Sequence, residues 1–263
     1  MKSYSDGEIV LLLTATVTPQ FNYMAHKADA RLQQYVNAIQ WYLDHTPFRI
    51  VVGENSGYYQ LKEHFAPDDQ ERIELICYQE TNTTRQFGYN EMLILRHIYE
   101  ESKFIDKSTL ILKVTGRLIV KNINSHVRQL RRSKGDFIAA YIHRSLVYID
   151  SRFFAFTSSM FAHILSYEDA CCAIYWDDIH AGKVKNGEGG KYVDFESTIG
   201  AAIRDALRRD KKSFRFLFHP RIISGVEGYY GVTYNDGLWF QLKARVKSAL
   251  WYLDYHLFVK PRL

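Results

Sequence analysis

The sequence predicts an α/β fold with a mainly parallel sheet flanked by helices, a smaller antiparallel extension and a C-terminal amphipathic helix. Over the first half, short apolar runs alternate with segments of helical periodicity, which is the pattern of strands connected by covering helices. In the second half, short strands follow one another closely with loops between them. With 263 residues, 47% of them hydrophobic and 24% charged, the chain can bury one large core.

In the first half the expected strands are short apolar runs, and the expected helices repeat apolar residues every three or four positions. Leu32, Tyr35, Ile39 and Leu43 form one such stripe, and Met92, Leu93, Leu95, Ile98 and Tyr99 form another. In chain order the predicted elements are a strand at 8–14, a helix at 28–44, strands at 48–53 and 73–78, a helix at 89–102, a strand at 109–115 and a polar helix near 123–132.

The second half favours antiparallel strands and two further helices. Strands are predicted at 137–141 and 146–149, and the run SRFFAFTSSMFAHIL (151–165) reads as a strand that leads into a short helix. A glycine-rich loop at 187–190 precedes a helix that begins near Asp194, and FRFLFHPRIISG (214–225) predicts another strand and turn. No composition change marks a linker between domains.

The C-terminal portion is basic and aromatic. From residue 204 onward the chain has 12 Lys and Arg against 5 Asp and Glu, whereas the preceding residues are nearly neutral. In a helix from about Gly237, apolar residues recur at three- and four-residue steps, flanked by Lys243, Arg245 and Lys247. Such a helix could lie on the surface of an anionic membrane. A C-terminal helix that packs on the hydrophobic core explains the pattern equally well. No nucleic-acid-binding motif accompanies the charge, so no nucleic-acid partner is expected.

The expected location is the cytoplasm, with peripheral attachment to the inner face of the membrane. The apolar run at 9–13 is too short for a signal peptide, and no run is long enough to span a bilayer. The three cysteines show no metal-binding spacing and fit a reducing compartment.

The run TLILKVTGRLIVK (109–121) carries the first candidate site. A buried strand ends here in a small basic turn, so Lys113, Thr115, Gly116 and Arg117 bring cations and free backbone N–H groups to one strand end. Because ligands of α/β folds bind at the carboxyl ends of strands, this turn is a candidate phosphate site. An ordinary strand followed by a surface turn is the alternative.

The ends of the first two strands add further candidates. Thr14 and Thr16 in TAT would let a flat base or sugar approach the backbone, although a simple strand end is as plausible. Glu54, Asn55 and Ser56 in GENSGY follow the second strand, where a carboxylate commonly accepts hydrogen bonds from a ribose or base. A turn chosen for its Asn, Ser and Gly geometry is the alternative there.

The run GGKYVDFEST (189–198) offers a candidate general base. Asp194 and Glu196 flank the start of a helix, and either carboxylate could take a proton from an acceptor hydroxyl. Capping of the helix N-terminus is the competing explanation for both. The sequence does not separate the two residues.

A late loop offers donors for a diphosphate. FHPRIISGVEGYYG (218–231) combines His219 and Arg221 with a pliant glycine-rich chain that includes Gly225 and Gly228, which suits a clamp or lid over a bound nucleotide. The acidic pair in YWDDIH (175–180) could hold a divalent metal, but an exposed acidic loop is the more common case.

The order of these parts resembles the GT-A group of sugar-nucleotide glycosyltransferases, especially bacterial enzymes of capsule, lipopolysaccharide and other surface glycans. ENSG lies where that group contacts base and ribose, LILKVTGRLIV occupies the place of its metal-binding Asp-x-Asp motif, and GGKYVDFES is similar to its acidic helix start. FFAFTSSMF is similar to the segment after the motif, and His219 matches a late histidine by position. The resemblance spans most of residues 8–235.

The resemblance implies a transferase that moves a sugar from a nucleoside-diphosphate sugar onto a glycan or lipid-linked acceptor, with inversion. Residues 1–236 would form one catalytic domain, with a nucleotide-sugar half at about 1–121 and an acceptor half at 122–236, followed by the basic aromatic helix at 237–263. Lys113 and Arg117 stand where aspartates would bind a metal, which suggests an enzyme without a metal cofactor that neutralises the diphosphate with cations.

A different class of function also fits the pattern. The chain could be a non-catalytic, membrane-associated binding module with a degenerate transferase fold that docks on lipids through its basic C-terminus.

Overall fold

The computed structural model describes residues 3–19, 28–81, 86–133, 135–143, 148–209, 214–216, 221–226, 233–234 and 237–259. Its strands are β1 (Ile9–Ala15), β2 (Arg49–Glu54), β3 (Ile73–Cys77), β4 (Leu110–Thr115), β5 (Leu118–Val120), β6 (Ile138–His143), β7 (Tyr148–Thr157), β8 (Phe214–Phe216), β9 (Ile223–Val226) and β10 (Thr233–Tyr234). Its α-helices are α2 (Ala28–His45), α3 (Pro67–Gln70), α4 (Phe87–Glu101), α5 (Ile123–Leu130), α6 (Ser158–Leu165), α7 (Trp176–His180), α8 (Phe195–Arg209) and α9 (Leu238–Asp254).

Seven strands form the main sheet in the order β3-β2-β1-β4-β7-β6-β8. The first four are parallel, β7 runs antiparallel to both β4 and β6, and β8 is parallel to β6. A second sheet of three strands, β10-β9-β5, is antiparallel. The main sheet therefore continues without a break across residue 121, where the sequence suggested a boundary between two halves.

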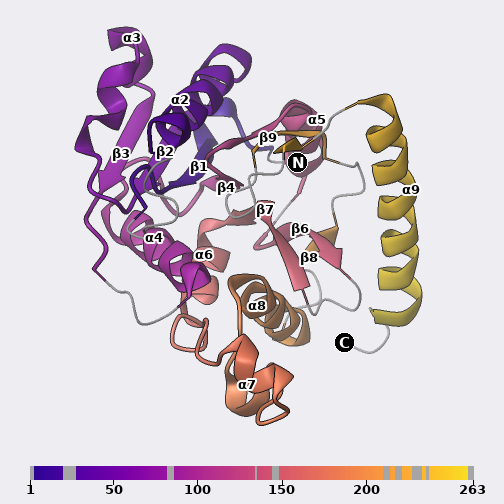
Figure 1. Ribbon diagram of the computed structural model, residues 1–263. Coiled ribbons are helices and arrows are strands. Elements are labelled where there is room, and N and C mark those ends of the chain that lie inside the picture. The colour runs from indigo at the N-terminus through magenta and orange to yellow at the C-terminus, as the bar shows by residue number, and fades with distance from the viewer. Residues whose placement is uncertain are drawn as a thin grey trace.

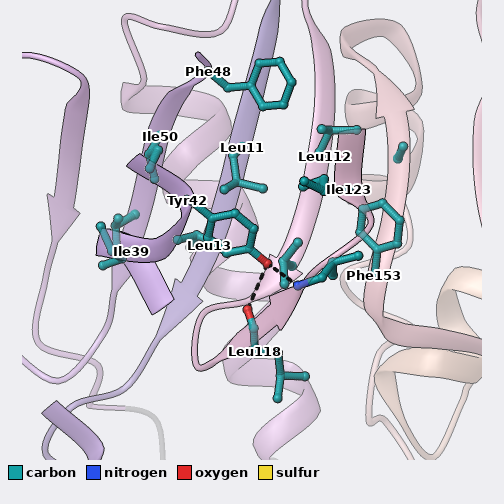
Figure 2. Close-up of a cluster of buried hydrophobic side chains, with 14 of the residues drawn as sticks. Leu11, Leu13, Ile39, Tyr42, Phe48, Ile50, Leu112, Leu118, Ile123 and Phe153 are labelled. Atoms are coloured by element: carbon teal, nitrogen blue, oxygen red, sulfur yellow. Dashed lines mark hydrogen bonds between the residues drawn. The ribbon is translucent and has the colours of Figure 1, made fainter. Parts of the chain in front are cut away.

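Helices cover both faces of the main sheet (Figure 1). Side chains of β1 alternate between them: Leu11 and Leu13 pack with α2 and α5, whereas Val10 and Leu12 pack with α4, α6 and α8. Figure 2 shows the first of these cores, in which the buried hydroxyl of Tyr42 accepts the Val120 N–H (2.8 Å) and donates to the Leu118 carbonyl (2.9 Å). These two bonds tie α2 to the small sheet.

The predicted fold class is confirmed: an α/β fold with a mainly parallel sheet, flanking helices, an antiparallel extension and a C-terminal helix. The strands predicted at 146–149 and from 151 onward are wrong as separate elements, since β7 is one strand from Tyr148 to Thr157. The polar run Asp150–Ser151–Arg152 resembles a break in the sequence, but these side chains are partnered: Ser151 bonds to Glu196, and both Arg152 and Arg221 pair with Asp150. Residues 146–147 lie outside the described residues.

Smaller differences follow from packing. On α4 the buried aliphatic positions include Ile94, whereas Tyr99, predicted to face inward, is 45% exposed. The short elements β5, β10, α3 and α7 were not expected from the sequence. β5 lies in the basic run after Gly116, where three residues give too little periodicity to recognise a strand.

Helix α9 lies at the edge of the molecule, apart from the helices that cover the sheet (Figure 1). Ser248 is buried along its length, and Tyr255, directly after it, packs against Phe214 with ring centroids 5.0 Å apart. The predicted apolar stripe faces the other way, with Leu238, Leu242 and Leu250 all more than half exposed. Among the described residues, no helix has the length and hydropathy needed to cross a bilayer.

Candidate active site

The carboxyl ends of the parallel strands gather several of the predicted residues at one edge. Ala15 lies beside Glu54, and Thr14 lies beside Thr115, in the registers of β1 with β2 and β4. Gly116 follows, and its N–H donates to the Thr14 carbonyl (2.9 Å). A Cβ at position 116 would stand 2.7 Å from that carbonyl oxygen, so the turn requires glycine to lie against β1.

Glu54 organises the loops after β1 and β2. Its fully buried carboxylate accepts backbone N–H bonds from Val17 (3.0 Å), Ser56 (3.0 Å) and Tyr58 (2.8 Å), and the Ser56 hydroxyl also donates to it. Buried charge of this kind needs several donors, and here the two loops supply them. In this conformation the carboxylate holds protein backbone, and its oxygens do not face an open surface.

Thr16, Asn55 and Ser56 connect the same two loops. The Thr16 hydroxyl donates to the Asn55 side-chain oxygen (2.6 Å), and the Ser56 hydroxyl accepts the Thr18 N–H (2.9 Å). The structure therefore brings these predicted residues together with Glu54 as one rigid rim at the carboxyl edge of β1 and β2.

Two arginines meet beside this rim, around Tyr35 of α2. Arg117 donates to the Tyr35 hydroxyl (2.8 Å), and Arg31 donates through Nε and Nη2 to the Thr16 carbonyl (3.0 and 2.8 Å). The Tyr35 hydroxyl also accepts the Thr16 N–H (2.9 Å). Arg117 is half-buried and the structure shows no carboxylate paired with it among the described residues, so its charge is available to an anion at the edge.

Lys113 lies elsewhere than the sequence suggested. Its side chain is fully buried between the rings of Phe154 and Phe195, and its ammonium donates to Glu91 of α4 and to the Ser151 carbonyl (2.7 Å). Because strand residues alternate between faces, Lys113 points into the core on the α4 and α8 side. Lys113 and Arg117 thus belong to two different networks.

Glu91 links Lys113 to the end of β1. Its Oε1 also accepts the Thr14 hydroxyl (3.2 Å), so Thr14 contacts a carboxylate through its side chain. In this ion pair the Lys113 side chain is fully buried, whereas the Glu91 side chain is 22% exposed.

Glu196, in the first turn of α8, lies on the other side of Ser151. Its Oε1 accepts the Ser151 hydroxyl (2.6 Å). Burial raises the pKa of the Glu196 carboxyl to about 7, opposed by the Ser151 hydrogen bond and aided by the negative charges of Glu91 and Asp194. A carboxyl that titrates near neutral pH can take up and release a proton under physiological conditions.

Asp194 has a different role from Glu196. Its Oδ1 accepts the N–H (2.7 Å) and the hydroxyl (2.5 Å) of Ser197, and its carbonyl accepts the Thr198 hydroxyl (2.7 Å). These are the bonds of a residue that caps the N-terminus of a helix. Of the two carboxylates between which the sequence could not choose, Asp194 caps α8, whereas Glu196 accepts the Ser151 hydroxyl.

Tyr148 stands beside both carboxylates. Burial raises the pKa of its hydroxyl, and the charges of Glu196 and Asp194 raise it further, opposed by Arg152. Tyr148 is 40% exposed, so the centre formed by Glu91, Ser151 and Glu196 adjoins the surface there.

The late loop is described in part. Arg221 packs against Tyr141 and pairs with Asp150, with 11% of its side chain exposed. Gly225 of β9 has φ +120°, and a Cβ there would stand 2.6 Å from the Arg117 carbonyl oxygen. Its place beside Arg117 therefore requires glycine. His219 and Gly228 lie outside the described residues, so their predicted contacts with a diphosphate remain predictions.

The acidic pair of YWDDIH lies in α7. Lys183 pairs with Asp178 (3.0 Å), and the His180 ring stacks on Trp176. Within the described ranges, no three His, Cys, Asp or Glu side chains gather into a group that could hold a metal ion.

Several residues of the site were not predicted from the sequence, among them Glu91, Ser151 and Tyr35. Glu91 had a detectable signal, because it lies four and seven residues before Leu95 and Ile98 and so falls on the apolar face of α4. Ser151 and Tyr35 had no such signal in the sequence. Ser151 lies in a polar run and Tyr35 in an ordinary apolar stripe, and only the fold brings the two residues to the edge of the sheet.

No model of a known protein family matches the chain, and no curated protein matches its sequence. Solved structures similar in arrangement include the galactosyltransferase LgtC in complex with donor and acceptor sugar analogs, with TM-score 0.48, 11% identity and coverage of 92% of this chain and 95% of that chain. A putative glucose-1-phosphate thymidylyltransferase from Bacillus anthracis has TM-score 0.46, 9% identity and coverage of 92% and 94%. A putative nucleotide-diphospho-sugar transferase from Desulfovibrio desulfuricans G20 has TM-score 0.44, 11% identity and coverage of 80% and 79%. Similarity at this level carries no inference about activity.

Proposed function

We propose that this protein is a glycosyltransferase that moves a sugar from a nucleoside-diphosphate sugar to a hydroxyl of a glycan or lipid-linked acceptor in the cytoplasm, in the synthesis of a bacterial surface polysaccharide. The observation that supports it most is the Glu196 carboxyl, whose pKa of about 7 and bond to Ser151 suit a general base at the carboxyl edge of the sheet. The resemblance of the sequence to GT-A enzymes supports the same class.

In the proposed reaction, the acceptor oxygen attacks the anomeric carbon as its proton passes to the Glu196 carboxylate. The bond between the anomeric carbon and the diphosphate oxygen breaks, and the nucleoside diphosphate leaves with that electron pair. One displacement inverts the anomeric centre. Glu196 then returns its proton to water, which is favourable at neutral pH because the pKa of the carboxyl is about 7.

The other residues are assigned by their contacts. Arg117 would neutralise the departing diphosphate, and the rim formed by Thr16, Asn55 and Ser56 would border the nucleoside. Thr115, Gly116 and Gly225 stay with the donor side as proposals, together with His219 and Gly228. Arg221 is not kept there, because it pairs with Asp150 and lines the cavity beside α9. We reassign Lys113 from contact with phosphate to a positioning role, because its ammonium holds Glu91 and the Ser151 carbonyl beside Glu196.

The donor set at the turn after β4 does not fit a divalent metal. A metal prefers carboxylate and carbonyl oxygens, whereas this turn offers the Arg117 guanidinium and the backbone of Thr115 and Gly116. We therefore propose transfer without a metal cofactor, with Arg117 in place of the cation's charge.

A screen of nucleotide sugars tests the donor class and the metal question together. We expect at least one UDP-, GDP-, CMP- or dTDP-sugar to raise the melting temperature, and transfer or slow hydrolysis of that donor to proceed equally in EDTA and in manganese. Stabilisation follows from binding to the folded state alone. No stabilisation and no hydrolysis with any donor would contradict the transferase, and activity lost in EDTA and restored by manganese would contradict the metal-free proposal.

We also propose that α9 attaches the enzyme to an anionic membrane surface. Its outward stripe is aliphatic, and Lys243 and Lys247 flank it on one side while Arg245 flanks it on the other, as in helices that lie in the headgroup region. A second copy fits this face less well, because two α9 helices packed stripe to stripe would bring the cations of each copy together.

Vesicle flotation tests this attachment. Leu250→Glu, which places a charge on the stripe, should lower binding to phosphatidylglycerol vesicles by at least about tenfold, since burying one leucine is worth about 1.5–3 kcal/mol. Tyr59→Glu is the matched control, because Tyr59 and Leu250 are similarly exposed, at 60% and 61%. Equal flotation of the two variants would contradict attachment through α9, and flotation without any transfer activity would favour the binding module.

A further inference from the structure

A cavity of about 340 Å³ lies between α9 and the sheets, away from the Glu196 centre. Its walls come from β6, β7, the small sheet and the inward side of α9. The residues that line it include Arg152, Arg221, Tyr234, Lys243, Lys247 and Trp251. Its size is that of pockets that hold small molecules.

The cavity walls carry more positive than negative charge. Arg152, Arg221, Lys243 and Lys247 line it, and one carboxylate, Asp150, contacts both of these arginines. Arg152 uses Nε (2.8 Å) and Nη2 on Asp150, so this pair is closed on itself. The two lysines have exposed side chains at the α9 side. Within the part of the chain that the structure describes, no carboxylate pairs with either lysine, so an anion entering the cavity would meet their charges.

Arg221 is the strongest evidence that the cavity binds an anion. One end of its guanidinium, Nη2, pairs with Asp150, and the plane lies 4.8 Å from the centre of the Tyr141 ring. Its other end, Nη1, is buried and has no hydrogen-bond partner among the described residues. A buried unsatisfied donor of this kind is costly, and a ligand oxygen would satisfy it. Burial lowers the pKa of Arg221 to about 10, so the group is still charged at neutral pH.

Flat rings surround these cations. Arg152 lies 5.0 Å from the centre of the Tyr234 ring, and Lys247 lies 4.6 Å from that of Trp251. Phe240 completes the aromatic wall. The cavity thus pairs a cationic end with an aromatic wall against which an apolar or planar group can pack.

The cavity is separate from the carboxylate centre, although the two share a strand. Along β7, Ser151 bonds to Glu196, whereas its neighbours Asp150 and Arg152 turn toward Arg221. Successive strand residues point to opposite faces, so the two centres lie on opposite sides of β7.

We propose that this cavity is a second binding site, for a phosphate-bearing ligand whose apolar or planar body packs on Tyr234 and Trp251. The phosphate would take the free Nη1 of Arg221 and the ammonium groups of Lys243 and Lys247. Phosphate suits this set because a dianion offers several acceptor oxygens to a guanidinium and two amines. The source is either a lipid phosphate or a soluble phosphate ester.

Calorimetry with inorganic pyrophosphate, on the full chain, tests the site. Lys243→Gln and Lys247→Gln should each weaken binding by about tenfold, the effect of losing one contact to a charged group. Arg245→Gln is the matched control, because it removes the same charge from the same helix without lining the cavity. Binding should quench Trp251 fluorescence, and Trp251→Phe should remove that quench while calorimetric binding persists. These exposed positions allow the variants to fold even if a change at Arg221 does not.

Two further probes distinguish the sources. Tighter binding of farnesyl phosphate than of pyrophosphate would identify a lipid phosphate, and tighter binding of uridine monophosphate would identify a soluble ester. Pyrophosphate that does not bind, or that binds equally weakly to the Lys243→Gln and Arg245→Gln variants, would overturn the proposal. An Arg117→Gln variant separates this site from the donor site, because it should leave binding at the α9 cavity unchanged.

Discussion

Glu196→Gln is expected to lower the rate of sugar transfer by about 10²–10⁴-fold, the contribution of a general base. Glutamine keeps the size of the side chain and can still accept the Ser151 hydroxyl, but it cannot take a proton from the acceptor. Donor binding should therefore be unchanged. Initial rates with saturating donor, together with the melting-temperature shift given by that donor, measure the two effects separately.

The dependence of the rate on pH identifies Glu196 more specifically. Only the carboxylate form can act as base, so the wild-type rate should rise with pH and level off above about 7, where the carboxyl has lost its proton. Stability should change in the opposite direction. Because burial raises the pKa in the folded protein, the folded state loses stability as the pH rises from the usual range of a glutamate to about 7.

Glu196→Gln should remove both pH effects, and Glu188→Gln, at an exposed turn before α8, should remove neither. A Glu196→Gln enzyme with near-normal turnover and the same pH profile would show that another group takes the proton.

Lys113→Met is expected to lower the free energy of unfolding by about 3–5 kcal/mol, the cost of removing one partner from a buried ion pair. The substitution keeps a long apolar chain between Phe154 and Phe195 but leaves the Glu91 carboxylate and the Ser151 carbonyl without the ammonium. Urea unfolding followed by circular dichroism measures the loss.

The double variant Lys113→Met with Glu91→Leu is the control. Replacing both partners by apolar groups removes the unpaired carboxylate, so the double variant should be more stable than Lys113→Met alone. A double variant whose loss equals the sum of the two single losses would mean that the pair is not energetically coupled.

The fold could be predicted well from the sequence where periodicity is long and regular. The parallel strands and the helices α2 and α4 were expected within a few residues of their bounds, and α8 was expected within a few residues of its start. Alternation of apolar runs and amphipathic segments is a strong signal. β7 was split and β5 was missed, because a polar run inside a strand and a three-residue strand look like turns until their partners are known. Pairing of β7 with β4 is a long-range property that no local pattern contains.

That the residues after the parallel strands meet at one edge could be predicted from the sequence, but their contacts could not. Residues that follow β1, β2 and β4 do meet at one edge, as parallel strands require. The sequence could not show that Lys113 faces the core rather than the edge, or that Asp194 caps α8 while Glu196 lies half-buried beside Ser151. The orientation of Lys113 and the different roles of Asp194 and Glu196 depend on which helix or strand packs against each of them. Those packing partners are distant in the chain.

The continuity of the main sheet limits how this chain can be divided. β4 pairs with β1 on one side and with β7 on the other, and β5 pairs with β9. A piece that ended at residue 121 would keep β4 with one side unpaired, as an open row of N–H and C=O groups ready to join another chain. A gene fragment that encodes either half alone therefore specifies an incomplete sheet with an unpaired edge that is prone to aggregate. Recombination that keeps the main sheet intact has to move both halves together.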